Sequence, residues 1–196
     1  MPKAVQFILP KSVQFIFLLT IVSIDGEKKY EIERRAFSAK GVYEIRDYDT
    51  LKEIGIFRNK LMSLKADTEI EIGEKHYHFI QESAKSMKYH CENVNDEKEK
   101  YLIQAHHGHS TSIFKNQNQV GWWNKKSFVI LEGNKYRIEM NFDEDPILFS
   151  AFAVLVDNYR ISITIGGDIG WELGNMGKGL TNRNENWKIK KKPDDN

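Results

Sequence analysis

Histidine is the residue type in this chain best suited to metal binding or acid–base chemistry. His76 and His78 are two positions apart, so on a strand they share a face, and His106, His107 and His109 cluster around a glycine. A zinc site needs three or four ligands, and the chain has neither a cysteine pair nor a His-Glu-x-x-His helix. Ordinary strand and turn histidines are the favoured interpretation, and we expect no bound metal or other cofactor.

Two segments come close to nucleophile and phosphate motifs without matching either. Residues 108–112 lack the second glycine of Gly-x-Ser-x-Gly and fall between predicted strands, where a nucleophile elbow needs a strand-to-helix turn. Residues 174–179 fail the spacing of a phosphate loop. No catalytic residue is assigned, and a small enzyme with a dispersed site involving the His106/His107/His109 cluster remains the alternative function.

Two groups of basic residues are candidates for contact with anionic phospholipid. The early group surrounds one loop, and the later group combines lysines with an aromatic pair; together they comprise Arg34, Arg35, Lys40, Trp122, Trp123, Lys125 and Lys126. If the later group forms an exposed loop, the rings enter the membrane interface while the ammonium groups approach phosphate. The alternative is that the tryptophans pack in the core and the lysines are simply solvated.

Composition limits the partners and the compartment. Lysines and arginines number 29 and aspartates and glutamates 28 in 196 residues, so no global charge attracts the chain to nucleic acid. Cys91 is the only cysteine, which leaves no intrachain disulfide and suits a reducing cytoplasm. We therefore expect a cytoplasmic protein, in contact with a membrane only at its periphery, whose partner is anionic phospholipid or another protein.

The elements that must position these residues are mostly strands. From residue 21 to residue 142, tight-turn clusters recur between β-rich segments, and stretches such as 68–72 and 136–140 alternate apolar and charged residues. The apolar run at residues 15–22 is predicted as a first core strand, and a cleaved signal peptide is the alternative. About ten to twelve strands result, a number that favours a barrel or a sandwich over an open sheet.

One buried helix is predicted near residues 146–159. Asp145 is a good N-cap and Pro146 fits the first helical position. Residues 147–156 are apolar on every side, yet they provide only about half of the roughly 20 residues that cross a bilayer. We therefore expect no transmembrane segment. The fold predicted is a mainly β, closed antiparallel β-barrel of about 12 strands that encloses one hydrophobic C-terminal helix.

The order of these elements resembles the tubby C-terminal superfamily, especially the LURP-one-related proteins and more distantly the phospholipid scramblases. The resemblance covers about residues 12–160 and rests on Asp25-Gly-Glu-Lys-Lys-Tyr-Glu-Ile32, Val42-Tyr-Glu-Ile-Arg-Asp-Tyr-Asp-Thr-Leu-Lys-Glu-Ile54, Leu61-Met-Ser-Leu64 and the Asp145-Pro146 helix. The turn at residues 47–50 lacks the glycine often found in such relatives. The resemblance implies phosphoinositide or phospholipid contact through basic residues of a barrel, and it identifies no catalytic residue.

The chain divides into a barrel domain over residues 1–165 and a tail over residues 166–196. Residues 161–165 alternate and are predicted as one last strand, whereas the tail is rich in glycine, asparagine and lysine and is predicted to be flexible. The function predicted is a non-enzymatic, cytoplasmic binding or scaffold domain that contacts anionic phospholipid at the membrane surface.

Overall fold

The computed structural model describes residues 4–8, 19–24, 27–35, 41–60, 65–83, 86–106, 110–129, 133–166, 184 and 186–191. For residues 4–8, 19, 125–129, 133–136 and 160–166 it describes the backbone but not the side chains. The strands of the described chain are β1 (Ala4–Ile8), β2 (Leu19–Ile24), β3 (Glu27–Arg34), β4 (Val42–Asp47), β5 (Glu53–Asn59), β6 (Asp67–Ile72), β7 (Lys75–Gln81), β8 (Lys88–Asn93), β9 (Asp96–Ala105), β10 (Ser110–Lys115), β11 (Asn118–Val129) and β12 (Gly133–Met140). The single helix of the described residues, α1, spans Pro146–Gly166.

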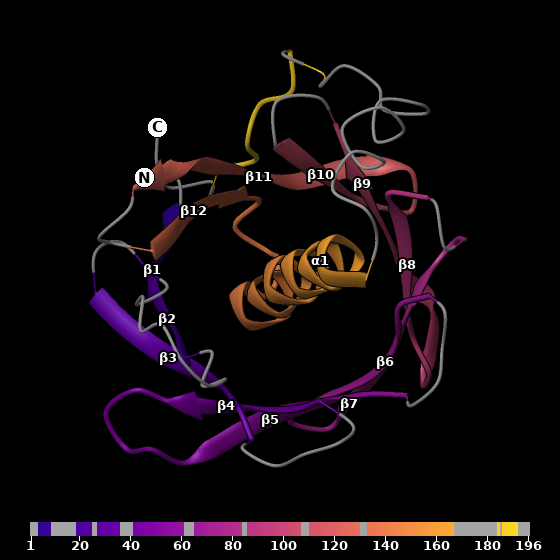
Figure 1. The fold of residues 1–196 in the computed structure, drawn as a ribbon. Helices are drawn as coiled ribbons and strands as arrows, with labels where there is room; N and C mark the ends of the chain where they lie inside the picture. The colour runs from indigo at the N-terminus through magenta and orange to yellow at the C-terminus, as the bar shows by residue number, and fades with distance from the viewer. Residues whose placement is uncertain are drawn as a thin grey trace.

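Each strand pairs antiparallel with the next one along the chain. Because β1 also pairs with β12, the strand order is that of a closed barrel, β1-β12-β11-β10-β9-β8-β7-β6-β5-β4-β3-β2. Figure 1 shows α1 inside the ring of strands. The prediction of a mainly β, antiparallel fold with one helix is confirmed.

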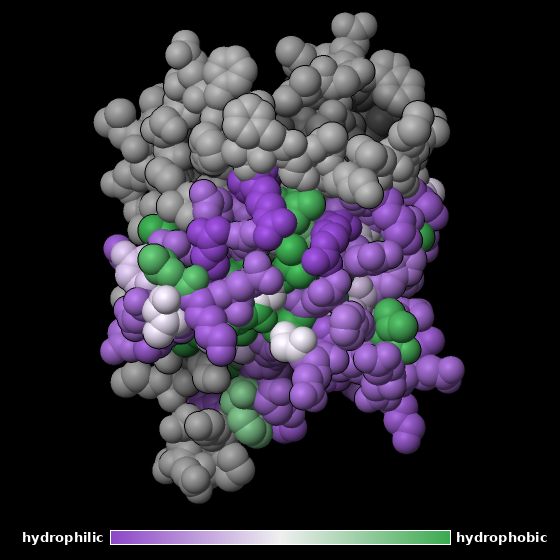
Figure 2. All heavy atoms as spheres, turned by 90° about the horizontal axis from the view of Figure 1, so that it is seen from below, coloured by the Kyte–Doolittle hydropathy of each residue, from purple (hydrophilic) through white to green (hydrophobic). Residues whose placement is uncertain are grey.

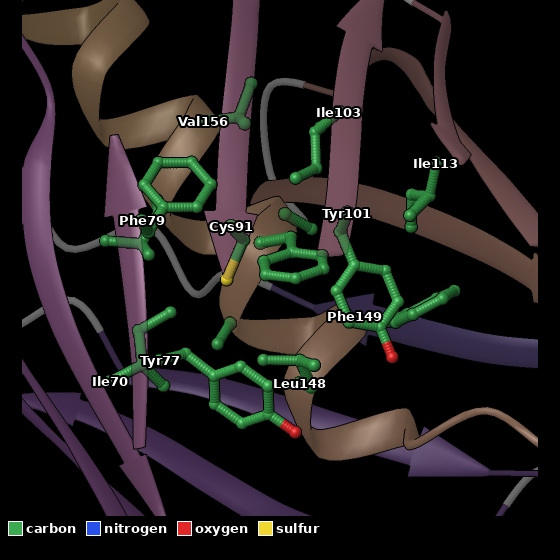
Figure 3. Packing of buried hydrophobic residues seen from close by; sticks show 14 of the residues in the cluster. Ile70, Tyr77, Phe79, Cys91, Tyr101, Ile103, Ile113, Leu148, Phe149 and Val156 are labelled. Atoms are coloured by element: carbon green, nitrogen blue, oxygen red, sulfur yellow. The ribbon is translucent and has the colours of Figure 1, made fainter. Parts of the chain in front are cut away.

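Alternation along the strands produces the core. In β7, Tyr77 and Phe79 point inward while His76 and His78 face outward, as the period of two requires. The inward side chains pack against the helix, and Figure 3 shows the rings of Tyr77, Phe79 and Tyr101 around residues of α1. The outer face seen in Figure 2 is largely hydrophilic.

Helix α1 begins where the sequence predicts. The Asp145 carboxylate accepts a hydrogen bond from the backbone N–H of Ile147 at 2.8 Å, which satisfies one of the donors left free at a helix start. Leu148, Phe149, Phe152 and Leu155 are fully buried. No helix among the described residues is long and apolar enough to cross a membrane.

The predicted strand at residues 161–165 is wrong, because α1 continues through Gly166. The alternating pattern in these residues is short. Extending a helix that has already formed adds one backbone hydrogen bond per residue, so continuing the helix is favoured over starting a strand. The helix therefore exceeds the predicted range of 146–159.

The C-terminal segment contacts the barrel instead of being free throughout. The indole N–H of Trp187 donates to the backbone oxygen of Gln119 at 2.8 Å. The backbone N–H of Lys190 donates to the side-chain oxygen of Asn141 at 2.9 Å, and the Lys190 ammonium lies 2.9 Å from Asp143. The prediction of a flexible tail is therefore wrong for residues 186–191, while residues 167–183 and 192–196 lie outside the described residues.

Antiparallel pairing fixes which turns share an end of the barrel. Even-numbered strands all finish at one end, where α1 also begins, and we call this the helix-start end. Odd-numbered strands finish at the opposite end, which we call the helix-finish end, and Tyr159 of α1 reaches β6 there, with its hydroxyl 3.0 Å from the hydroxyl of Thr68.

Candidate functional site

A buried carboxylate, Glu99, organises the interior at the helix-start end. It accepts hydrogen bonds from the Asn93 amide at 2.7 Å, the Tyr101 hydroxyl at 3.1 Å and the Tyr77 hydroxyl at 3.3 Å, and the Lys75 ammonium lies 3.2 Å away. Burial acts to raise the pKa of Glu99, but the donors, led by Asn93 and Lys75, outweigh it and hold that pKa below its ordinary value. The carboxylate is therefore charged and well supplied with donors.

The same cluster, which we call the Glu99 network, reaches the start of α1. The Tyr101 hydroxyl also lies 3.1 Å from Glu144, and the Lys115 ammonium lies 3.4 Å from Glu144 and 3.8 Å from Glu99. Burial, together with the charges of Glu144 and Glu99, raises the pKa of Tyr101, so its hydroxyl stays protonated and donates. These contacts tie β9 and β10 to the segment before the helix.

Of the three clustered histidines, only His106 lies among the described residues. It is buried, and its Nε2 lies 2.8 Å from the hydroxyl of Ser112, a distance suited to a base beside a nucleophile. Ser112 is only 1% exposed and also accepts from the Gln119 amide at 3.4 Å, so a substrate has no access to it. His107 and His109 lie outside the described residues.

The other two histidines lie on the outer face of β7. His78 Nε2 is 2.8 Å from Asp67, and His76 is exposed. Burial acts to raise the pKa of Asp67, but His78 and Lys60 outweigh it and lower that pKa. Within the described ranges, no group of three His, Cys, Asp or Glu side chains could hold a metal ion.

Trp122 and Trp123 do not form an exposed loop, so the loop on which their predicted lipid contact depends is not present. Both lie within β11, where Trp123 points into the core and is 2% exposed. Trp122 is half-buried, and its indole N–H donates to Glu139 on β12 at 3.1 Å. Lys125 and Lys126 continue the same strand and pair with Tyr136 and Lys135. The alternative interpretation, tryptophan packed in the barrel, applies to Trp123.

The early basic group is partly neutralised. The Arg35 guanidinium donates to Glu44 and lies 3.9 Å from Glu53, so two carboxylates share it. Burial acts to raise the pKa of Glu44, but hydrogen bonds from Arg35 and Arg46 outweigh it and lower that pKa. Arg34 is the last residue of β3, and Lys40 lies outside the described residues.

The two basic groups nevertheless lie at the same end of the barrel, on strands separated by β2, β1 and β12. Arg34 closes β3, and Lys125 and Lys126 lie toward the close of β11, so both groups sit at the helix-finish end. Basic positions outnumber acidic ones among the described residues of that end. The basic positions are Arg34, Arg35, Arg58, Lys60, Lys65, Lys88, Lys125, Lys126, Lys135 and Arg160, and the acidic positions are Glu33, Glu44, Asp67, Glu69, Glu82 and Asp157. The near-neutral chain is therefore polarised along the barrel axis.

An open groove of about 480 Å³ lies on the side of the barrel, over β8, β9 and β10. Its lining residues are His90, Glu92, Lys100, Tyr101, Leu102, Gln104, Phe114, Asn116 and Gln117. None of these residues is predicted as a site from the sequence. The available signal was Leu102 and Phe114, apolar residues at positions that face outward because Tyr101, Ile103 and Ile113 face the core.

Comparison with known proteins gave no match to a protein family, to a curated protein or to a solved structure.

Proposed function

We propose that this chain is a non-enzymatic binding domain of the tubby C-terminal type, in which a barrel around a central helix presents a basic end to anionic phospholipid. The observation that carries the proposal is the gathering of Arg34, Lys125 and Lys126 at the helix-finish end. Each lysine or arginine near an anionic surface contributes roughly 1 kcal/mol of attraction, so several on one end produce appreciable affinity.

The interior supports a binding role over a catalytic one. Apolar side chains of the strands and of α1 fill the core, including Phe57, Phe79, Phe149 and Phe152 at 0% exposure. The carboxylate of Glu99, which could otherwise serve as an acid or a base, is occupied by several donors. Groups able to meet a ligand therefore lie on the outside.

Liposome flotation tests the phospholipid proposal. The variant carries Arg34→Glu and Lys126→Glu, and the vesicles contain either phosphatidylcholine alone or phosphatidylcholine with phosphatidylserine, at about 0.1 M salt. Loss of two attractive charges predicts at least roughly a 30-fold weaker association with the anionic vesicles. Arg34 shares a strand face with the buried Ile32 and pairs with Tyr43, so the melting temperature is measured for the double variant and for Lys126→Glu alone. Weaker association counts in favour of the proposal only for a variant that melts like the parent.

The matched control reverses two exposed lysines at the helix-start end, Lys52→Glu and Lys98→Glu. This control has the same change in net charge, so it separates the position of charge from its total. Equal weakening by the two double variants, or equal binding to neutral and anionic vesicles, would contradict the proposal and leave a protein partner as the remaining ligand class.

A further inference from the structure

The groove on the barrel side combines an apolar floor with hydrogen-bond donors at its edges. Leu102 and Phe114 are half-buried neighbours on β9 and β10 and form the floor. Lys100 lies on the same outer face of β9, two positions from Leu102. Gln117 lines the groove from the β10–β11 turn.

The cation of the groove is only loosely held. The Lys100 ammonium lies 3.6 Å from Glu92, and the two side chains are 50% and 56% exposed. Exposed pairs of this kind contribute little to stability, so an incoming anion can take the place of Glu92 at small cost. The exposed Gln117 amide has no hydrogen-bond partner among the described residues, which leaves its N–H groups available to the same anion.

The backbone conformation of Gln117 is unfavourable for a glutamine. Asn116 and Gln117 form the two-residue loop of the hairpin with φ values of 49° and 71°. Positive φ at both positions belongs to a type I′ turn, in which the second position strongly favours glycine. A glutamine there keeps a side chain over the groove at the expense of backbone stability, a pattern found where strain is stored at functional sites.

We propose that this groove binds a small organic anion with an apolar body. The anionic group would be held by Lys100 and Gln117, and the apolar body would lie on Leu102 and Phe114. The groove volume of about 480 Å³ falls within the range of about 300–1,000 Å³ typical of small-molecule sites, which favours a single small ligand over an extended macromolecule. The site is separate from the basic end proposed to meet phospholipid.

A dye that matches this description, 8-anilinonaphthalene-1-sulfonate, tests the site by its fluorescence on titration into the full-length protein. Its uncharged relative, N-phenyl-1-naphthylamine, keeps the aromatic body and lacks the sulfonate. We expect saturable binding of the sulfonate dye, and at least about 5-fold weaker binding of that dye to Lys100→Gln. Lys98→Gln is the matched control, because Lys98 is exposed on the same strand and does not line the groove.

The variant Gln117→Gly separates function from structure. Relief of the positive φ should raise the melting temperature by about 2–4 °C, while loss of the amide weakens dye binding. A more stable protein that binds less dye would support a binding role for Gln117. The proposal is overturned if Lys100→Gln and Gln117→Gly bind the dye like the parent, if Lys98→Gln loses as much binding as Lys100→Gln, or if the neutral relative binds equally well.

Discussion

Gly121 of β11 lies where an added side chain would collide with the central helix. A Cβ atom placed on Gly121 would lie 2.6 Å from Cε2 of Phe149 and 3.1 Å from the backbone oxygen of Glu139. The Phe149 ring cannot easily move away, because it packs against two other rings. Its centroid lies 6.1 Å from the ring centroid of Tyr101 and 5.8 Å from that of Phe152. Gly121→Ala therefore forces the helix or the strand to shift.

Overpacking of this kind costs about 1–3 kcal/mol. For a domain of this size, each kcal/mol lowers the melting temperature by roughly 2–4 °C, so Gly121→Ala should lower it by about 2–12 °C. Urea unfolding of the single and double variants with Phe149→Leu measures the coupling directly. A smaller side chain at residue 149 makes room for the methyl group, so the two changes should couple by about 0.5–3 kcal/mol in the stabilising direction.

The control for this cycle is Gly73→Ala, because a Cβ atom on Gly73 meets nothing within 4 Å. Gly73 has a φ of 57°, so alanine there costs backbone strain alone and should not couple to Phe149→Leu. The packing of the helix against β11 is refuted if Gly121→Ala leaves stability unchanged, or if its coupling to Phe149→Leu is no larger than that of Gly73→Ala.

Three further predictions address the core, a turn and the Glu99 network. Phe152→Asp should leave no cooperatively folded protein when its thermal unfolding is followed by circular dichroism. An unpaired charge at a 0% exposed site costs several kcal/mol, a large share of a typical free energy of unfolding of about 5–15 kcal/mol. Soluble protein with normal melting would contradict the enclosed helix. Leu51→Gly should raise the free energy of unfolding in urea by about 0.5–1 kcal/mol. Leu51 has a φ of 56°, which glycine adopts more easily than leucine, and its side chain is 60% exposed. A loss of stability would show that the leucine side chain makes a needed contact. The pKa of Glu99 in the folded protein lies below its ordinary value, so the stabilisation by this carboxylate is present above the ordinary pKa and is lost as pH falls through the lower folded-state pKa. Glu99→Gln should therefore lower stability at pH 7 and flatten the acid limb of a stability-versus-pH curve, and an unchanged acid limb would exclude Glu99 as a contributor.

Local sequence signals were sufficient for the start of α1 and for the strand content. Asp145 and Pro146 specify a helix start through backbone chemistry, which depends on neighbouring residues only. The end of the helix could not be predicted in the same way. Residues 161–165 alternate like a strand, yet they continue a helix that is already formed, so the outcome depends on context beyond the segment.

The candidate site was harder to predict because it depends on which face of a strand each residue occupies. A register shift of one residue would place Trp122 in the core and Trp123 outside. The sequence alone gives two adjacent tryptophans followed by lysines, a pattern equally compatible with a loop. Pairing with β10 fixes the register, since Thr111 lies opposite Trp123 and Ser112 opposite Trp122.

The groove illustrates a further limit of sequence reasoning. The floor of the groove requires Leu102 and Phe114 to be cross-strand neighbours. The hydrogen-bond donor Gln117 requires a two-residue hairpin loop that follows Lys115. The pairing of Leu102 with Phe114 is not local, because it depends on the register between β9 and β10. The glutamine at Gln117 is the exception. A two-residue hairpin loop that places glutamine where glycine is favoured conflicts with its own turn, and local conflicts of this kind concentrate at functional positions. The same residue therefore links the strain of the turn to the ligand proposed for the groove.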